Sequence, residues 1–151
     1  MKNDFRGFYE SLSMSLEGEE DNVYWEIIKY TPSFFKLLCK VQADKRISWH
    51  VKLIVNSALS YFVIPNDIIP EEEYGAKGYI DDVFVCAYVL KGIKDETGGK
   101  NIIFDNWEGE GEIDEIIDVV YRESRKVVGD KYKKILNFVG LLNEGKGPEE
   151  E

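Results

Sequence analysis

The distribution of apolar and polar positions predicts a helical protein with two strongly apolar helices at its centre. One helix is expected over residues 48–64, with Ser48 as its N-cap; from residue 53 onwards only Asn56, Ser57 and Ser60 are polar. The second is expected over residues 79–93, where an unbroken apolar run extends from residue 83 to residue 90. Helices that are apolar on nearly all sides are typical of the middle of a bundle. We therefore predict that these two helices form a buried central hairpin.

Apolar residues at helical spacing also predict helices on both sides of this hairpin. Such spacing occurs over residues 4–16, 21–29, 32–43, 113–128 and 130–143. Thr31 before Pro32 fits a helix start in which the threonine is the N-cap and the proline takes the first helical position. The region 97–111 is the least regular. Its glycine pair at 98–99 predicts a turn, residues 101–105 a short strand or extended segment, and residues 107–111 a loop.

Together these elements predict an all-α fold, a compact bundle of about six or seven helices. The chain has 151 residues, of which 44% are hydrophobic and 13% aromatic, and this is enough apolar material for one core. We expect a single helical domain over residues 1–144. The remaining residues, 145–151, contain no large apolar side chain and are expected to form a frayed acidic tail.

The charge of the chain argues against two classes of partner. A net charge of −10 repels phosphate backbones and anionic lipid surfaces, so we expect no nucleic-acid binding and no membrane contact. The longest apolar run, residues 83–90, is also far shorter than the ~20 residues that span a bilayer. We therefore expect a soluble protein.

Two cysteines, Cys39 and Cys86, each lie inside an apolar helical pattern. The sequence has no CxxC motif and no histidine at metal-ligand spacing from either cysteine. We therefore expect two reduced, buried thiols. The sequence alone does not decide whether the two cysteines form a disulfide. The first residues also lack the apolar segment of a secretory signal. These observations favour a cytoplasmic location.

The loop between the two central helices holds the most ordered group of polar residues in the chain. Pro65 must end the first helix, and Pro70 can begin a short helix in which Glu71 complements the helix dipole. Asp67 lies between the prolines and can accept hydrogen bonds from its own turn, while Gly78 permits a positive φ. Two further aspartates, Asp81 and Asp82, fall in the first turn of the second helix, where free N–H groups favour carboxylates. All these residues therefore have a local structural explanation.

A functional alternative is that Asp67, Asp81 and Asp82 converge around the loop. Three carboxylates can bind a hard cation such as Mg²⁺ or Ca²⁺ through their oxygen atoms. A catalytic carboxylate pair would need further components, and the sequence shows no nucleophile motif, no oxyanion loop and no nearby histidine. The single histidine, His50, lies at the start of the first central helix and is expected to be a partly exposed polar residue. No catalytic residue is predicted.

The same residues resemble the signature of the domain-of-unknown-function 1232 family, the YkvA-like proteins. That signature has an apolar helix ending in Tyr, then Pro-x-Asp-x-x-Pro and an acidic residue, then Gly and an Asp-Asp pair opening another apolar helix. The matching residues, within about 51–90, are Tyr61, Pro65, Asp67, Pro70, Glu71, Gly78, Asp81 and Asp82. Glu71 departs from the pattern, since aspartate is commoner there, and the loop up to residue 77 is more acidic than usual.

The resemblance implies little about activity. The family has no common established function, a related segment occurs in a membrane-bound RING-type ubiquitin ligase, and some members are predicted to contact membranes through their apolar helices. Our first hypothesis is a non-enzymatic helical module that binds a protein partner or organises a complex. The second is a divalent-cation-binding protein or metal-dependent enzyme that uses the three aspartates. No cofactor is predicted apart from Mg²⁺ or Ca²⁺ under that second hypothesis.

Overall fold

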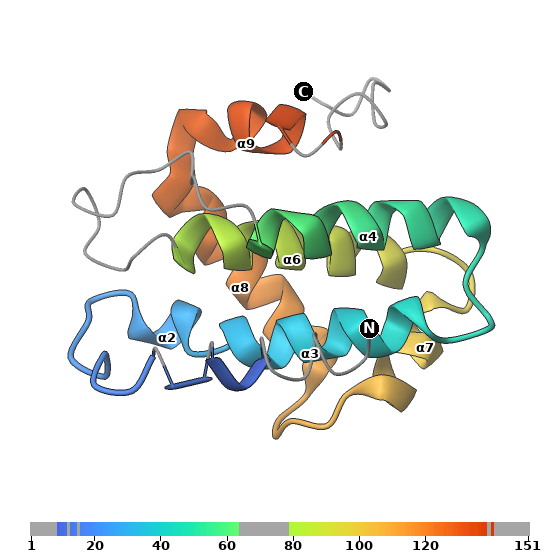
Figure 1. The fold of residues 1–151 in the computed structure, drawn as a ribbon, viewed down its shortest axis with the longest axis horizontal. Coiled ribbons are helices and arrows are strands. Elements are labelled where there is room, and N and C mark those ends of the chain that lie inside the picture. The colour runs from blue at the N-terminus through green and yellow to red at the C-terminus, as the bar shows by residue number, and fades with distance from the viewer. Residues whose placement is uncertain (1–8, 12, 15, 64–78, 139, 141–151) are drawn as a thin grey trace.

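A computed structural model describes residues 9–11, 13–14, 16–63, 79–138 and 140 of the chain. Residues 9–11 and 13–14 are helical. The helices that follow are α2 (Trp25–Ile28), α3 (Thr31–Gln42), α4 (Trp49–Val63), α6 (Tyr79–Lys94), α7 (Gly99–Asn106), α8 (Ile113–Val128) and α9 (Tyr132–Phe138), with a 3₁₀ turn at Gly129–Lys131 before α9. No strand occurs in the described ranges, and the predicted all-α fold is confirmed (Figure 1).

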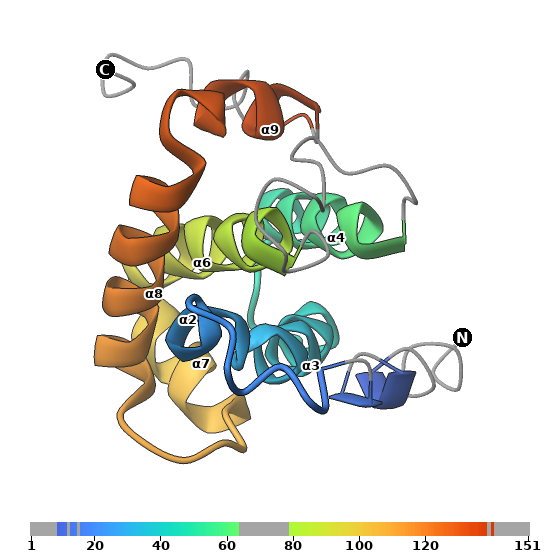
Figure 2. The ribbon, with the colours of Figure 1, turned by 90° about the vertical axis from the view of Figure 1, so that its left-hand side faces the viewer.

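Helix α6 is the centre of the fold. It contacts α2, α3, α4, α7, α8 and α9, most extensively α8. Figure 2 shows α6 in the middle, with α8 running across its side, α4 beside it, α2, α3 and α7 on one side and α9 on the other. Its residues from 79 to 87 are buried without exception, including both aspartates. The near-continuous apolar sequence of this helix is therefore explained by contact on every side.

Helix α4 pairs with α6, as the sequence predicts, but only part of its surface is buried. Val51, Val55 and Ala58 face the core and are at most 5% exposed. The opposite side of the helix is open to solvent at Trp49, Leu53, Asn56 and Ser60. The polar residues that interrupt the apolar pattern of α4 thus mark an outer face.

The expectation of a strand or extended segment at 101–105 is wrong, because these residues are part of α7. Ile102 and Ile103 of this helix are buried. The turn before it does contain a left-handed glycine, Gly98, with φ 80°. Gly99 lies so close to the carbonyl group of Ile93 that a Cβ atom would clash with it. A helix of eight residues offers too few turns for a clear apolar period, so its packing against α3 and α6 decides the conformation.

Two predicted helix caps have different outcomes. Ser48 does cap α4, since its Oγ accepts a hydrogen bond from the N–H of Val51 at 3.1 Å. Thr31 is not an N-cap: it is the first residue of α3, and its buried hydroxyl donates to the carbonyl oxygen of Ile28 at 2.7 Å. The threonine therefore ties α3 back to α2. Residues 21–24 form turns, so α2 is shorter than the helix predicted over 21–29.

Candidate functional site

The signature residues Tyr61 and Asp81 meet inside the core. Tyr61 lies near the end of α4 and is 1% exposed, and Asp81 lies in the first turn of α6 and is fully buried. The tyrosine hydroxyl donates a hydrogen bond to Oδ2 of Asp81 at 2.8 Å. A buried carboxylate is tolerated only where hydrogen bonds replace its water. The pair therefore acts first as a polar connection between the two central helices.

Asp82 occupies the position next to this pair and is 8% exposed. Both aspartates lie in the first turn of α6, as predicted from the sequence. One turn further along the helix, Cys86 is fully buried, and burial, followed by the nearby charge of Asp82, raises the pKa of its thiol well above the usual value. The thiol therefore stays protonated and is a poor nucleophile. Both cysteines are free in the structure, but Cys39 is only half-buried, so the expectation of two buried thiols is wrong for Cys39.

The other signature residues lie outside the described part of the chain. These are Pro65, Asp67, Pro70, Glu71 and Gly78. The convergence of Asp67 with Asp81 and Asp82 is thus a prediction that the geometry does not test. Within the described ranges, no three His, Cys, Asp or Glu side chains are grouped as metal ligands.

The opposite end of α6 carries a second polar connection, to α8. Lys94 is 8% exposed, and its Nζ lies 2.7 Å from Oδ1 of Asp114 and 3.0 Å from Oδ1 of Asp118. Burial alone would lower the pKa of Lys94, but the hydrogen bonds to Asp114 and Asp118 outweigh it, so the pKa is raised. The two carboxylates keep the lysine charged. Such an arrangement is typical of a structural ion pair and not of a group that transfers protons.

A small cavity lies between α3 and the segment that follows α7. It has a volume of about 80 Å³, and Tyr9, Ser33 and Trp107 are among the residues that line it. The buried indole N–H of Trp107 has no acceptor among the described residues. Pockets for metabolites usually measure ~300–1,000 Å³, so a volume of this size suits a few water molecules.

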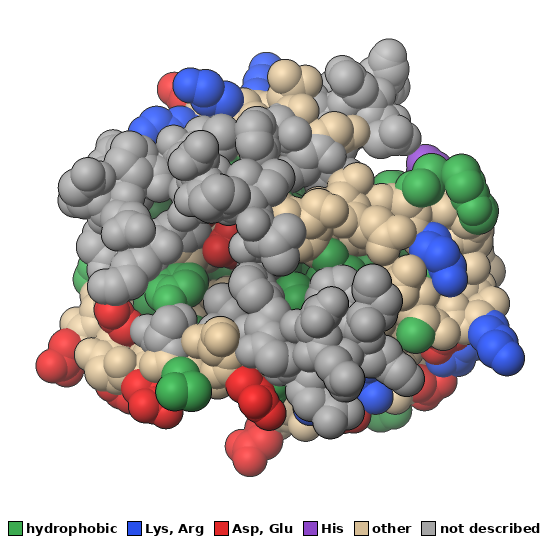
Figure 3. Space-filling view, viewed as in Figure 1, with side chains coloured by type: hydrophobic (Ala, Val, Ile, Leu, Met, Phe, Trp, Pro, Cys, Tyr) green, Lys and Arg blue, Asp and Glu red, His purple; other side chains and the backbone are tan. Residues whose placement is uncertain are grey.

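The most distinctive surface lies on the outer side of α4 and was not predicted from the sequence. We define the α4 outer face as Trp49, Leu53, Asn56 and Ser60. The side chain of Trp49 is 73% exposed and that of Leu53 is 46% exposed. Figure 3 shows hydrophobic side chains beside the single histidine at the end of the molecule where α4 begins. The available signal was the spacing of the four residues at i, i+4, i+7 and i+11, which places them on one side of a helix.

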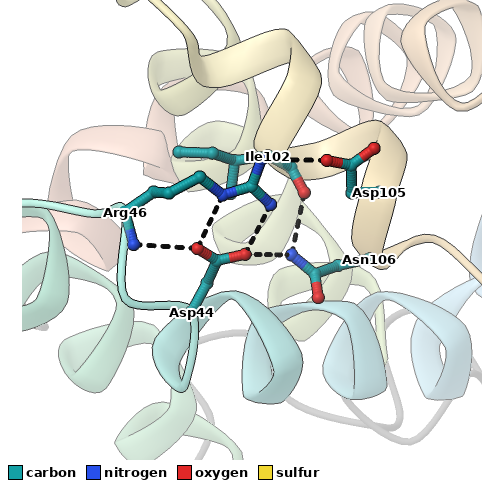
Figure 4. A network of polar contacts seen from close by, with 5 residues as sticks. All are labelled: Asp44, Arg46, Ile102, Asp105 and Asn106. Atoms are coloured by element: carbon teal, nitrogen blue, oxygen red, sulfur yellow. Dashed lines mark hydrogen bonds and ion pairs between the residues drawn. The ribbon is translucent and has the colours of Figure 1, made fainter.

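The segment before α4 is fixed in place by a network of charged side chains (Figure 4). Arg46 donates to both carboxylate oxygens of Asp44, at 2.9 and 2.7 Å, and to Asp105 of α7 at 2.9 Å. Asn106 also donates a hydrogen bond to Oδ2 of Asp44, at 3.0 Å. The hydrogen bonds from Arg46, followed by that from Asn106, hold the pKa of Asp44 far below its usual range. The network joins the start of α4 to the end of α7, so Trp49 projects from a fixed support.

Comparison with known proteins identifies the family. A family model described as "Protein of unknown function (DUF1232)" matches residues 51–88, the segment that includes the Tyr61–Asp81 pair. The chain is also 33% identical over 136 residues to "Uncharacterized protein ORF9" of Methanothermobacter thermautotrophicus, which covers 90% of this chain and 89% of that protein. The chain belongs to the DUF1232 family. The resemblance seen in the sequence is thereby confirmed.

No solved structure matches this DUF1232 chain significantly. In the described part of the chain, none of the helices has both the length and the apolar character needed to cross a membrane. Neither the family description nor the relative's name states an activity.

Proposed function

We propose that this DUF1232 protein is a non-enzymatic interaction module that binds a protein partner through the α4 outer face. The observation that carries the proposal is the exposure of Trp49 and Leu53, one turn apart on the same side of a rigidly supported helix. Large apolar side chains are normally buried, and tryptophan is enriched among the residues that dominate binding energy at interfaces. Burial of these two side chains against a partner would remove apolar surface from water.

The signature carboxylates support a structural role under this proposal. Asp81 accepts the hydrogen bond of Tyr61 and both aspartates are buried beneath the surrounding helices. The hydrogen bond of Asp81 holds α6 against α4, and α4 in turn presents the outer face. Because both cysteines are free thiols, we expect the protein to act in a reducing compartment such as the cytoplasm.

Photo-crosslinking tests this function. A photoreactive amino acid is placed at Asn56, which is exposed on the α4 outer face, and at Glu115 of α8 as a matched exposed control. In native extract we expect a defined crosslinked product from position 56 only. The product should disappear when Trp49→Ser is added and persist with Val119→Ser, since Val119 is 44% exposed on α8. No defined product from position 56, or an equal yield from both positions, would contradict the proposal.

The cation hypothesis remains a separate proposal, in which Asp67 would join Asp81 and Asp82 around Mg²⁺ or Ca²⁺. What supports it is the pair of adjacent buried carboxylates at the start of α6. Oxygen atoms of this kind are the ligands that hard cations prefer. A thermal melt with and without Mg²⁺ or Ca²⁺ distinguishes it from the interaction module.

A further inference from the structure

We infer that the partner segment is an acidic amphipathic helix, which packs apolar side chains on Trp49 and Leu53 and places carboxylates beside Lys45 and Lys52. This inference rests on the proposed function and adds the chemistry of the partner. Three features of the α4 region support it: its shape, its charge and its rigidity.

The shape of the α4 outer face suits a helix. Its four residues span eleven positions, or about 16 Å at the rise of an α-helix. The apolar residues of this face, Trp49 and Leu53, lie at one end of it. Asn56 and Ser60 at the other end have short side chains, so that part of the face projects little from the helix. A partner helix of about three turns can therefore lie along α4, with apolar residues at i and i+3 or i+4 against the tryptophan and leucine.

The charge around this face is opposite to that of the molecule as a whole. The chain has 29 acidic and 19 basic residues, yet residues 45–66 contain no Asp or Glu. Arg46 is occupied by two carboxylates, whereas Lys45 and Lys52 form no ion pair with the described residues. Figure 3 shows Lys and Arg side chains close to the hydrophobic end of α4. Acidic residues on the partner would be attracted here, whereas basic residues would be attracted to the acidic remainder of the surface.

Rigidity favours binding of a short segment. The network of Arg46 with Asp44 and Asp105 fixes the start of α4 before a partner arrives. A preformed surface loses little conformational entropy on association, so a few apolar contacts suffice for measurable affinity. A second copy of this chain is a poorer occupant, because pairing two α4 outer faces would bring the lysines of both copies together. An extended anionic lipid surface would also meet the acidic remainder of the molecule, whereas a short helix contacts only the α4 region.

Two synthetic peptides test the inference on the full-length protein. Each has 16 residues and a fluorescent label, with leucines at i, i+3, i+4 and i+7; the remaining charged positions are glutamate in one peptide and lysine in the other. Fluorescence anisotropy should show that the glutamate peptide binds at least tenfold more tightly than the lysine peptide, and more weakly as salt rises. The indole N–H signal of Trp49 should shift in the NMR spectrum on addition of the glutamate peptide alone.

Substitutions make the test specific. Trp49→Ser should weaken binding of the glutamate peptide at least tenfold, and the matched variant Val119→Ser should not change it. In the double variant Lys45→Glu, Lys52→Glu, the lysine peptide should bind more tightly than the glutamate peptide. In Lys126→Glu, on α8, the glutamate peptide should remain the tighter binder. All five positions are exposed or partly exposed, so circular dichroism and melting should confirm that each variant folds.

Several results would overturn the inference. These are equal or absent binding of the two peptides, a dimer in sedimentation that Trp49→Ser dissolves, and flotation with vesicles of phosphatidylcholine and phosphatidylglycerol that the same variant removes. The second would assign the face to another copy of this chain and the third to a membrane. If the crosslink from position 56 persists while the glutamate peptide fails to bind, the interaction function stands and only the partner chemistry is wrong.

Discussion

The hydroxyl of Tyr61 donates to Oδ2 of Asp81 across the boundary between α4 and α6, over 2.8 Å and in the absence of solvent. The two residues are separated by 20 positions in the chain, yet both belong to the family signature. The bond therefore connects the part of the signature on α4 with the part on α6. Its removal is the most direct way to ask what the signature does for the fold.

We expect Tyr61→Phe to lower the free energy of unfolding by about 1–3 kcal/mol, because the aspartate loses a buried hydrogen-bond donor while the ring is retained. Chemical denaturation followed by circular dichroism measures the change. Tyr121→Phe is the control, since its ring stacks on Phe84 at 5.9 Å and its hydroxyl makes no hydrogen bond with the described residues. Equal losses in the two variants would mean that the Tyr61–Asp81 bond contributes nothing specific.

Substitutions at two lysines of α6, Lys94 and Lys91, should differ in how much they destabilise the protein. Lys94→Met should lower stability by about 1–2 kcal/mol, because Asp114 and Asp118 lose their shared cation and repel each other one turn apart. Lys91→Met should cost less than about 0.5 kcal/mol, because this lysine is 40% exposed and lies 3.6 Å from Asp118. Thermal unfolding of both variants measures the difference. A larger loss at Lys91 than at Lys94 would contradict it.

Acid should destabilise the protein through carboxylates whose pKa is low in the folded state. The hydrogen bonds from Lys40 and then Lys36 lower the pKa of Glu108 from 4.5 to about 2. Its contribution is therefore present above pH 4.5 and is lost as the pH falls towards 2. Glu108→Gln should flatten the fall of the melting temperature over this range. Glu110→Gln is the control, since Glu110 makes no ion pair with the described residues, and an equal effect of the two would refute the assignment.

The thiols should react slowly with thiol reagents in the folded protein. Burial raises the pKa of Cys39 to about 11 and raises that of Cys86 well above its usual value. At pH 8 only about one Cys39 side chain in a thousand would be the reactive thiolate. Ellman's reagent should therefore react slowly with the native protein and rapidly with two thiols in guanidinium. Rapid reaction of either thiol under native conditions would contradict the raised pKa values.

A melt in the presence of metal distinguishes the two functional hypotheses. The interaction module predicts an unchanged melting temperature in 10 mM Mg²⁺ or Ca²⁺. A site of ~0.1 mM affinity would instead add about 2.7 kcal/mol and raise the melting temperature by several degrees. If such a rise occurs and Asp82→Asn abolishes it, the cation hypothesis is supported. The proposal that the signature carboxylates are purely structural is then wrong.

The sequence predicts the helical fold, the family and the place of both aspartates because these depend on local patterns. The apolar runs of α4 and α6, the cap at Ser48 and the Asp-Asp pair at a helix start all involve neighbouring residues. It fails at α7, where Ile102 and Ile103 are placed by contacts with distant helices. It also fails for the α4 outer face, because the nearly all-apolar pattern of this helix predicts burial on every side, whereas Trp49 and Leu53 are exposed. Which side of an apolar helix remains uncovered depends on the positions of all the other helices.

The central position of α6 also bears on how the protein unfolds. Every other helix from α2 to α9 with described bounds contacts it, so detaching any one of them exposes part of the same apolar surface. Such a hub couples the helices, and unfolding should proceed in one cooperative step with the amides of α6 the slowest to exchange with solvent. Resistance to proteases would then follow the global stability of the molecule rather than the strength of any single helix.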